Sequence, residues 1–235
     1  MKLSIMQPYL FPYLGYFQLI NAVDKFVVYD DVAFIKQGWI NRNFLLLNGR
    51  KYLFTFPVKS ISSNAPINET FVSKTPFNWQ QKLQQTIIQA YRKAPFFKDV
   101  FPMVESIISQ STDKPIAQVA TESIEAVVKY LSIKTDIQLS SSIYENDHLK
   151  NTDRVIDICT KENAIAYINA IGGQQLYKQE TFAQKKINLY FIKSTLPAYE
   201  QFDREFINGL SIIDVMMFNS PEKVKNDFLP MYSLV

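Results

Sequence analysis

The stretch LSIMQPYLFPYLGYFQLINAVDKFVVYDD, residues 3–31, decides the fold of this chain. The apolar run at 3–6 indicates a buried strand that Pro8 ends, and the run at 25–29 indicates a second one. Between them, apolar residues at 14–20 suggest a short helix. A strand, loop, helix and strand in about thirty residues form a βαβ unit, whose strands run parallel. We therefore predict an α/β protein with a mostly parallel, Rossmann-like sheet.

A β-hairpin insertion is predicted directly after this unit. Two apolar runs, 44–47 and 52–56, flank Asn48-Gly49, and both residues of that pair tolerate the positive φ angles of a tight hairpin turn. Residues 60–68 are polar and indicate a loop. The insertion is therefore antiparallel, unlike the sheet before it.

The middle of the chain is predicted to be a helical lobe. Thr75 is expected to cap its first helix, with Pro76 in the first turn, and Asp113 to cap its last. Strand-like runs then resume, and the tail from Ser211 indicates helix. We expect an N-terminal α/β half with the hairpin at 1–75, the helical lobe at 76–132, and a C-terminal α/β half at 133–235 that completes the same domain.

Composition narrows the class of protein. The 235 residues are 47% hydrophobic and 20% charged, with a net charge of +3, which is typical of a globular chain. No basic cluster of the kind that binds nucleic acid is present. No segment has the roughly 18 apolar residues of a membrane span, no signal peptide is visible, and the single cysteine allows no intramolecular disulfide. We expect a cytoplasmic protein without a nucleic-acid partner.

The common catalytic fingerprints do not occur. The chain contains no G-x-x-x-x-G-K-[ST], no G-x-G-x-x-G and no G-x-S-x-G. One cysteine, Cys159, and one histidine, His148, cannot form a Cys/His zinc site, so no metal site is predicted. Cys159 falls on the apolar face of a helix, which favours packing over nucleophilic chemistry. Four other groups of residues remain as candidates.

The first candidate is the loop that contains Gln7-Pro8 and Tyr13-Leu14-Gly15-Tyr16 and opens the first helix. Ligands of parallel α/β sheets bind outside the carboxyl ends of the strands, and a helix N-terminus there can hold phosphate. The arrangement resembles the opening of the HIGH-type nucleotidyltransferase and synthetase fold, but tyrosines replace both histidines, so that motif's chemistry does not carry over. We predict that Gln7, Tyr13, Gly15 and Tyr16 bind substrate. A proline-fixed loop with aromatic packing explains the pattern equally well.

The second candidate begins at Asp30-Asp31, which closes the second strand. An aspartate there could act as a base or bind a sugar hydroxyl, and Arg42 could clamp a phosphate with two N–H groups. A turn with surface salt bridges explains each of these residues taken singly, and explains the whole set less well. We predict a catalytic role for Asp30, Asp31 and Lys36, and substrate binding for Trp39, Asn41 and Arg42.

The third and fourth candidates lie in the C-terminal half. Asn169, Gly172 and Gly173 end a buried strand and are expected at the same sheet edge as the first loop, where a Gly-Gly pair admits a ligand close to the backbone. A plain strand-to-helix turn accounts for them as well. Ser211 precedes an apolar run with Asp214 three residues later, which indicates a helix cap. Asp214 could instead orient a substrate hydroxyl.

Several of these segments together resemble the WbqC-like family. The resemblance implies a bacterial protein of the kind often encoded with genes for surface polysaccharide such as O-antigen, and it assigns no catalytic residue. The segments, in order, are IMQPY at 5–9, GYF at 15–17, YDDV at 29–32, KQGWINRN at 36–43, INAIGG at 168–173 and GLSIIDV at 209–215.

Two functions follow from the resemblance and the candidate residues. The first is a transferase that moves an acyl or aminoacyl group to a nucleotide-linked amino sugar, with Tyr13 and Tyr16 stacking on a ring of the substrate. The second is a non-catalytic protein on a degenerate nucleotidyltransferase-like fold that binds a nucleotide-linked sugar or a partner. The partner in the first case is a small molecule. The sequence specifies no cofactor, a nucleotide being one option, and leaves the oligomeric state open.

Overall fold

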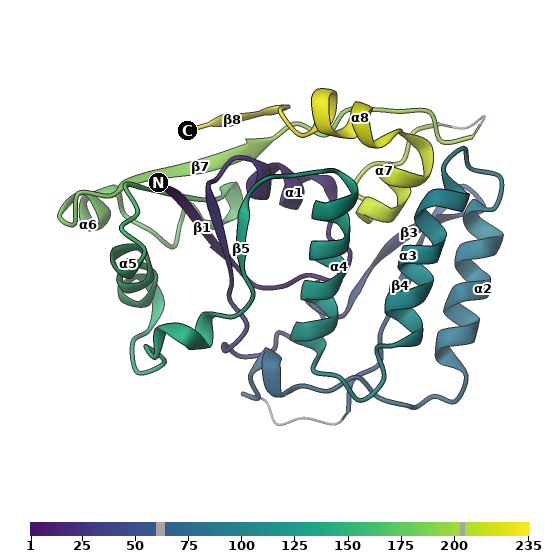
Figure 1. The fold of residues 1–235 in the computed structure, drawn as a ribbon, viewed down its shortest axis with the longest axis horizontal. Coiled ribbons are helices and arrows are strands. Elements are labelled where there is room, and N and C mark those ends of the chain that lie inside the picture. The colour runs from purple at the N-terminus through teal and green to yellow at the C-terminus, as the bar shows by residue number, and fades with distance from the viewer. Residues whose placement is uncertain (60–63, 203–204) are drawn as a thin grey trace.

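The computed structural model describes residues 1–59, 64–202 and 205–235, which contain a six-stranded sheet with helices on both faces (Figure 1). All neighbouring strands run parallel except the last pair. This confirms the predicted α/β fold. The final antiparallel strand corrects the expectation of a wholly helical tail. In spatial order the strands are β5 (Asp136–Gln138), β2 (Lys25–Val28), β1 (Lys2–Met6), β6 (Ala166–Ala170), β7 (Asn188–Ser194) and β8 (Tyr232–Leu234).

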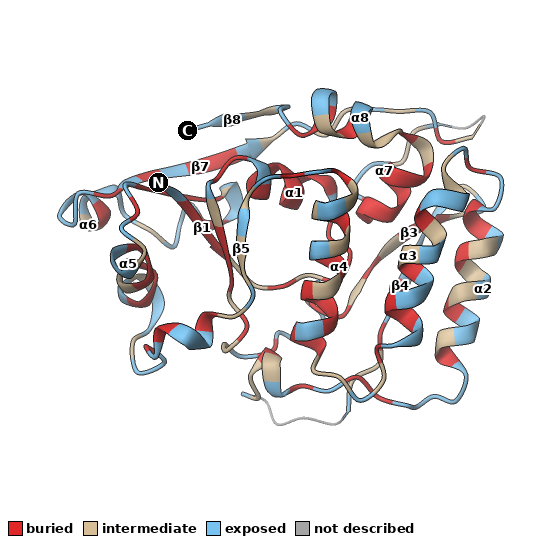
Figure 2. Ribbon diagram, viewed as in Figure 1, coloured by how far each residue is buried: buried red, intermediate tan, exposed pale blue. Residues whose placement is uncertain are grey.

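Side chains that alternate along the strands build a separate core on each face of the sheet. Phe26, Val28 and Ile168 point to the face that α1 (Leu14–Asn21) covers, whereas Val27 and Tyr167 point to the opposite face. That second face is covered by α5 (Asn151–Lys161) and α6 (Gln179–Ala183). Figure 2 shows the central strands as largely buried and the edge strands β5 and β8 as intermediate or exposed. The protein is therefore doubly wound.

The predicted hairpin is present and packs with the helical part of the chain. β3 (Arg42–Leu47) and β4 (Arg50–Thr55) pair antiparallel, and Asn48 and Gly49 have φ angles of 52° and 75°. The hairpin shares its core with α1 and with the remaining long helices. Those helices are α2 (Trp79–Tyr91), α3 (Phe97–Ser109), α4 (Ile116–Tyr130) and α7 (Ile212–Phe218), followed by the short α8 (Pro221–Lys223) and a π-helical turn (Val224–Phe228). Part of the predicted polar loop, residues 60–63, lies outside the described residues.

Two of the predicted helix caps are wrong and one is confirmed. The α2 helix begins only at Trp79, and the Thr75 hydroxyl is hydrogen-bonded to Ser73 instead. Asp113 does not cap α4, because its carboxylate forms ion pairs with Lys59 and Lys74. The Ser211 hydroxyl does accept the backbone N–H of Ile213 and caps α7. Polar residues therefore indicated roughly where each helix begins. Whether such a residue caps the helix depended on the other groups that its side chain contacts.

The chain reverses direction across the sheet between β1 and β6. From β1 the chain proceeds outward to β2 and β5 and then crosses back to β6 and β7. The loops that follow β1 and β6 therefore diverge at the carboxyl edge of the sheet. In doubly wound proteins this edge is where ligands bind.

Candidate functional site

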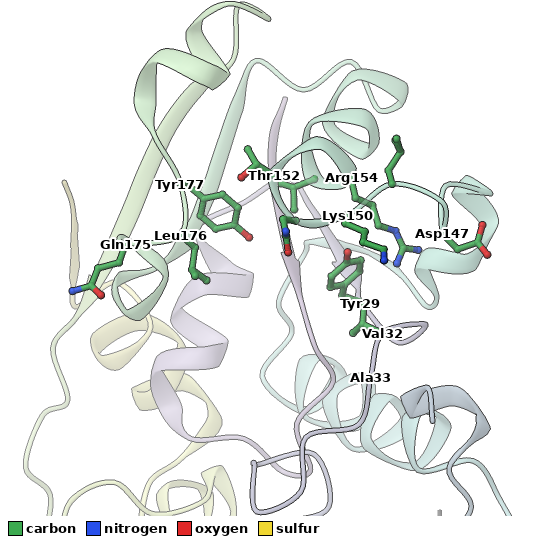
Figure 3. Close-up of a pocket in the computed structure, with 13 residues that line it drawn as sticks. Tyr29, Val32, Ala33, Asp147, Lys150, Thr152, Arg154, Gln175, Leu176 and Tyr177 are labelled. Carbon is green, nitrogen blue, oxygen red and sulfur yellow. The ribbon is translucent and has the colours of Figure 1, made fainter. Parts of the chain in front are cut away.

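A cavity of about 900 Å³ opens at the carboxyl edge of the strands, on the α5 side of the sheet (Figure 3). Three segments form its walls: the one that follows β2, the loop that leads into α5, and the loop that follows β6. Because α5 leads back into β6, its first turn and its free N–H groups lie at this edge. The lining residues are Tyr29, Val32, Ala33, Asp147, Leu149, Lys150, Asn151, Thr152, Arg154, Val155, Gln175, Leu176 and Tyr177.

The cavity combines aromatic rings with cationic groups. Figure 3 shows Tyr177 on one side and Tyr29 on another, with the nitrogen atoms of Arg154 and Lys150 near Tyr29. The Tyr177 ring is fixed from behind, because it packs edge-on against Tyr167 with the ring centroids 5.7 Å apart. Rings of this kind stack on sugars and bases, and cations of this kind bind phosphates or carboxylates.

Arg154 is buried in the cavity wall and held by two side chains. Its side chain is only 4% exposed, and its terminal nitrogen lies 2.5 Å from the Asp31 carboxylate. Its Nε–H donates to the Asn146 side-chain oxygen at 2.9 Å, and its guanidinium lies 4.9 Å from the centroid of the Tyr29 ring. Burial raises the pKa of Tyr29, while the charge of Arg154 acts in the opposite direction. The site therefore contains a fixed guanidinium.

The residues that form this cavity are not among the candidates predicted from the sequence, although the sequence contains one signal for Arg154. Arg154 shares a helix face with Val155, Ile158 and Cys159, all of which are buried. A charged residue within an apolar stripe indicates a buried and paired charge. The sequence predicts Tyr29 only as the last residue of the strand at 25–29.

Asp30 and Asp31 follow the end of β2, and both contact the Ser141 hydroxyl, which lies 3.3 Å from Asp30 Oδ1 and 2.5 Å from Asp31 Oδ1. Asp31 accepts hydrogen bonds from Arg154 and, at 2.5 Å, from the Ser141 hydroxyl. Asp30 accepts from the Ser140 hydroxyl at 2.8 Å and from the Ser141 N–H at 3.1 Å. Asp30 also borders a different hollow, of about 350 Å³, beside α4. Burial raises the pKa of Asp30, and its hydrogen bonds oppose that rise. The two carboxylates therefore meet at Ser141, and neither is among the residues that line the large cavity.

The loop after β1 is placed beside the end of β7. Tyr13 is 37% exposed, and a Cβ added to Gly15 would lie 2.4 Å from the Tyr13 ring and 2.9 Å from Ser194 Oγ. Gly15 therefore permits a close approach between the loop and β7. Tyr16 is 2% exposed, and its hydroxyl donates to the Gln7 carbonyl at 2.8 Å. The Tyr16 ring belongs to the core and cannot stack on a ligand in this structure, which corrects that expectation.

Lys36, Asn41 and Arg42 gather at a second hollow, of about 300 Å³, on the hairpin. Arg42 donates to the carbonyls of Gly38, at 3.0 Å, and Gln37, so two of its N–H groups hold a turn. Asn41 donates to the Phe56 carbonyl. This group is distinct from the residues that line the large cavity. Trp39 lies nearby with its ring 5.7 Å from that of Phe44.

Asp214 lies in the core and is not among the residues that line the large cavity. Its carboxylate accepts hydrogen bonds from Tyr91 at 2.9 Å, Tyr199 at 2.6 Å and Gln201 at 2.7 Å, and it is fully buried. Burial raises the pKa of Asp214 to about 6, although these three hydrogen bonds act to lower it. The carboxylate ties α7 to α2 and to the segment around Tyr199, so the structure gives it a folding role.

The predicted loop after β6 leads into the cavity. Asn169 is buried and its side-chain oxygen accepts the N–H of Ala170 at 2.8 Å. A Cβ added to Gly173 would lie 2.5 Å from the Asn169 amide nitrogen, whereas a Cβ added to Gly172 would meet nothing within 4 Å. The two adjacent glycines therefore have different roles.

A pair of substitutions tests this difference. Gly173→Ala is expected to destabilise the protein by about 1–3 kcal/mol, because the added methyl displaces the buried Asn169 side chain. Gly172→Ala, the matched control, is expected to change stability by less than about 0.5 kcal/mol. Urea unfolding of both variants measures this. If both substitutions change the free energy of unfolding equally, the Asn169 side chain can move aside without a loss of stability.

Strand order and cavity position together define a doubly wound α/β protein with its main cavity at the carboxyl edge of the sheet. The chain belongs to the WbqC-like protein family, whose model matches residues 7–226. It is also 26% identical over 220 residues to the uncharacterized protein Rv1507c of Mycobacterium tuberculosis (strain ATCC 25618 / H37Rv), a match that covers 93% of each chain. No solved structure matches the chain at a significant level.

Across 1–59, 64–202 and 205–235, no helix is long and apolar enough to cross a bilayer. Within that part of the chain, His, Cys, Asp and Glu side chains do not form a group of three or more that could hold a metal ion.

Proposed function

We propose that this protein is a transferase of bacterial surface-polysaccharide biosynthesis that acts in the cytoplasm. It would move an acyl or aminoacyl group to the amino group of a nucleotide-linked sugar bound in the large cavity. The amine nitrogen would bond to the acyl carbon, the bond from that carbon to its activating group would break, and the nitrogen would lose a proton. Family membership supports the polysaccharide context.

The observation that carries the proposal is the cavity at the carboxyl edge. Its volume of about 900 Å³ lies within the range of roughly 300–1,000 Å³ for small-molecule sites. Two tyrosines can pack on a sugar or base, and two cations can neutralise phosphates. Asp147 is the carboxylate among the lining residues and is available to a substrate amine. These groups match the mixed apolar and anionic character of a nucleotide-linked sugar.

Turnover by the purified protein tests the proposal. Nucleotide-linked amino sugars are incubated with acyl-coenzyme A, or with amino acids and ATP, and products are identified by mass spectrometry. We expect one acylated sugar nucleotide. Lys150→Ala should raise the KM for the nucleotide-linked sugar about tenfold, because it removes roughly one charge-assisted contact. Lys185→Ala, an exposed lysine outside the cavity, is the control. Absence of both binding and turnover across the substrates would overturn the proposal.

A non-catalytic binding role is the second candidate, and two observations favour it. Tyrosines stand at positions 13 and 16, where the HIGH-type motif has histidines. Asp30 and Asp31 are both engaged by side chains of the protein. Binding of a nucleotide-linked sugar without turnover, under any donor, would establish this role.

A further inference from the structure

We propose that Arg154 recognises the diphosphate group of the ligand, and that Asn146 and Asp31 are positioning residues that fix its guanidinium. The inference rests on the proposed function for the identity of the ligand, a nucleoside diphosphate derivative. The inference that Arg154 binds an anionic group rests on geometry alone. Its test uses inorganic pyrophosphate and is independent of turnover.

The geometry divides the guanidinium into a held edge and a free edge. An arginine side chain has five N–H donors. Asn146 engages the Nε–H, and Asp31 engages one terminal nitrogen. Arg154 lines the cavity, whereas Asn146 and Asp31 are outside its lining. The remaining donors lie on the side of Tyr29, which lines the cavity and whose hydroxyl also interacts with the guanidinium.

The two positioning residues are themselves fixed. The buried Asn146 amide donates to Asp157 Oδ2 at 2.7 Å, which determines that its oxygen faces Arg154. Asp31 is held by the Ser141 hydroxyl. A planar guanidinium fixed in this way presents its N–H groups as a preformed fork, which suits two phosphate oxygens at once. A lysine ammonium at the same place would keep the charge and lose the fork.

Lys150 adds a second cation in the same cavity. Lys150 and Arg154 both line the cavity, and Figure 3 labels both of them. Asp31 pairs with Arg154 and Asp147 also lines the cavity, so Lys150 is the second cation that a diphosphate can engage there. The fork selects the geometry of the anion, and Lys150 contributes charge.

The experiment measures pyrophosphate binding by calorimetry at pH 7.5 and constant ionic strength, with no divalent metal. Wild type is expected to bind. Arg154→Lys should weaken binding at least tenfold, and Arg50→Lys, on the exposed hairpin, should leave it within twofold of wild type. The unfolding temperature of each variant confirms that it is folded. Pyrophosphate binding that Arg154→Lys leaves unchanged, or wild type that binds none at millimolar concentration, would overturn the inference.

A swap of two side chains isolates the positioning role of Asn146. Asn146→Ala should weaken pyrophosphate binding about threefold to tenfold, while Asn188→Ala, an exposed control on β7, should not. The double variant Asn146→Asp with Asp157→Asn exchanges donor and acceptor, keeps an oxygen facing Arg154, and should restore affinity to within twofold. Affinity that stays low in the double variant would show that Asn146 does not act through this hydrogen bond.

The failures of the two proposals can be told apart. If pyrophosphate binding depends on Arg154 but no nucleotide-linked sugar is turned over, the transferase proposal is ruled out and the diphosphate site is retained. If the Arg154→Lys variant turns over the substrate at wild-type rates, the transferase proposal is retained and the proposed role of Arg154 is ruled out.

Discussion

Asp31→Ala is expected to lower the free energy of unfolding by about 3–5 kcal/mol, because it leaves a buried guanidinium without its counter-charge. The Arg154 side chain is 4% exposed and that of Asp31 is 14% exposed, so water cannot replace the lost carboxylate easily. Exposed ion pairs contribute only about 0–1 kcal/mol, and the Lys161–Asp157 pair, 44% and 29% exposed, is closer to that class. Urea unfolding at pH 7 measures the difference.

Two further variants identify the cause of that loss. Asp227→Ala removes an exposed carboxylate and should change stability by less than about 0.5 kcal/mol. Asp31→Ala combined with Arg154→Met removes both charges and should recover most of the lost stability, since paired buried charges are often replaceable by apolar groups. A folded Asp31→Ala protein that loses less than about 1 kcal/mol would mean that the guanidinium is solvated.

Tyr91→Phe is expected to destabilise the protein by about 3 kcal/mol at neutral pH. The Tyr91 hydroxyl accepts the Leu46 N–H at 2.8 Å and donates to Asp214, and the substitution leaves both of these buried groups one hydrogen bond short. Tyr190→Phe, which removes a hydroxyl from an exposed ring on β7, is the control and should have little effect. Chemical unfolding of both variants at pH 7 measures the effect.

The effect of Tyr91→Phe should also depend on pH. The pKa of Asp214 is raised to about 6, so its protonated form is favoured by folding. Its contribution to stability is fully present below the unfolded pKa of about 3.9 and is lost as the pH rises through 6. Because the Tyr91 hydrogen bond lowers this pKa, its removal should cost more at pH 7.5 than at pH 5. A cost that is equal at both pH values would show that Asp214 keeps one protonation state in this range.

The sheet and the hairpin were predictable because short-range signals define them. The apolar runs at 3–6 and 25–28 became neighbouring parallel strands, and Asn48-Gly49 formed the turn between β3 and β4. The strand β8 was missed because a three-residue edge strand has no periodicity to detect. It is specified by pairing with β7, far along the chain.

The position of the candidate site could be predicted from the sequence, but most of the residues that form it could not. The carboxyl edge of β2 was selected, and Asp31 does contact a residue of the cavity wall. Lys36 and Arg42 lie close to Asp31 in sequence, but the hairpin places them at another hollow. Arg154 is more than a hundred residues from Asp31, and only the packing of α5 on the sheet brings the two together. Contacts of this kind are tertiary, and no local pattern contains them.

The adjacent positions of Asp30 and Asp31 restrict how the gene can change during evolution. An insertion or deletion between Val28 and Asp31 would displace both carboxylates from Ser140, Ser141 and Arg154 in one event. Point substitutions alter one partnership at a time. We therefore expect relatives that keep the arginine of α5 to keep the length of this segment unchanged, while tolerating gaps in the exposed turn at 184–186, outside the cavity.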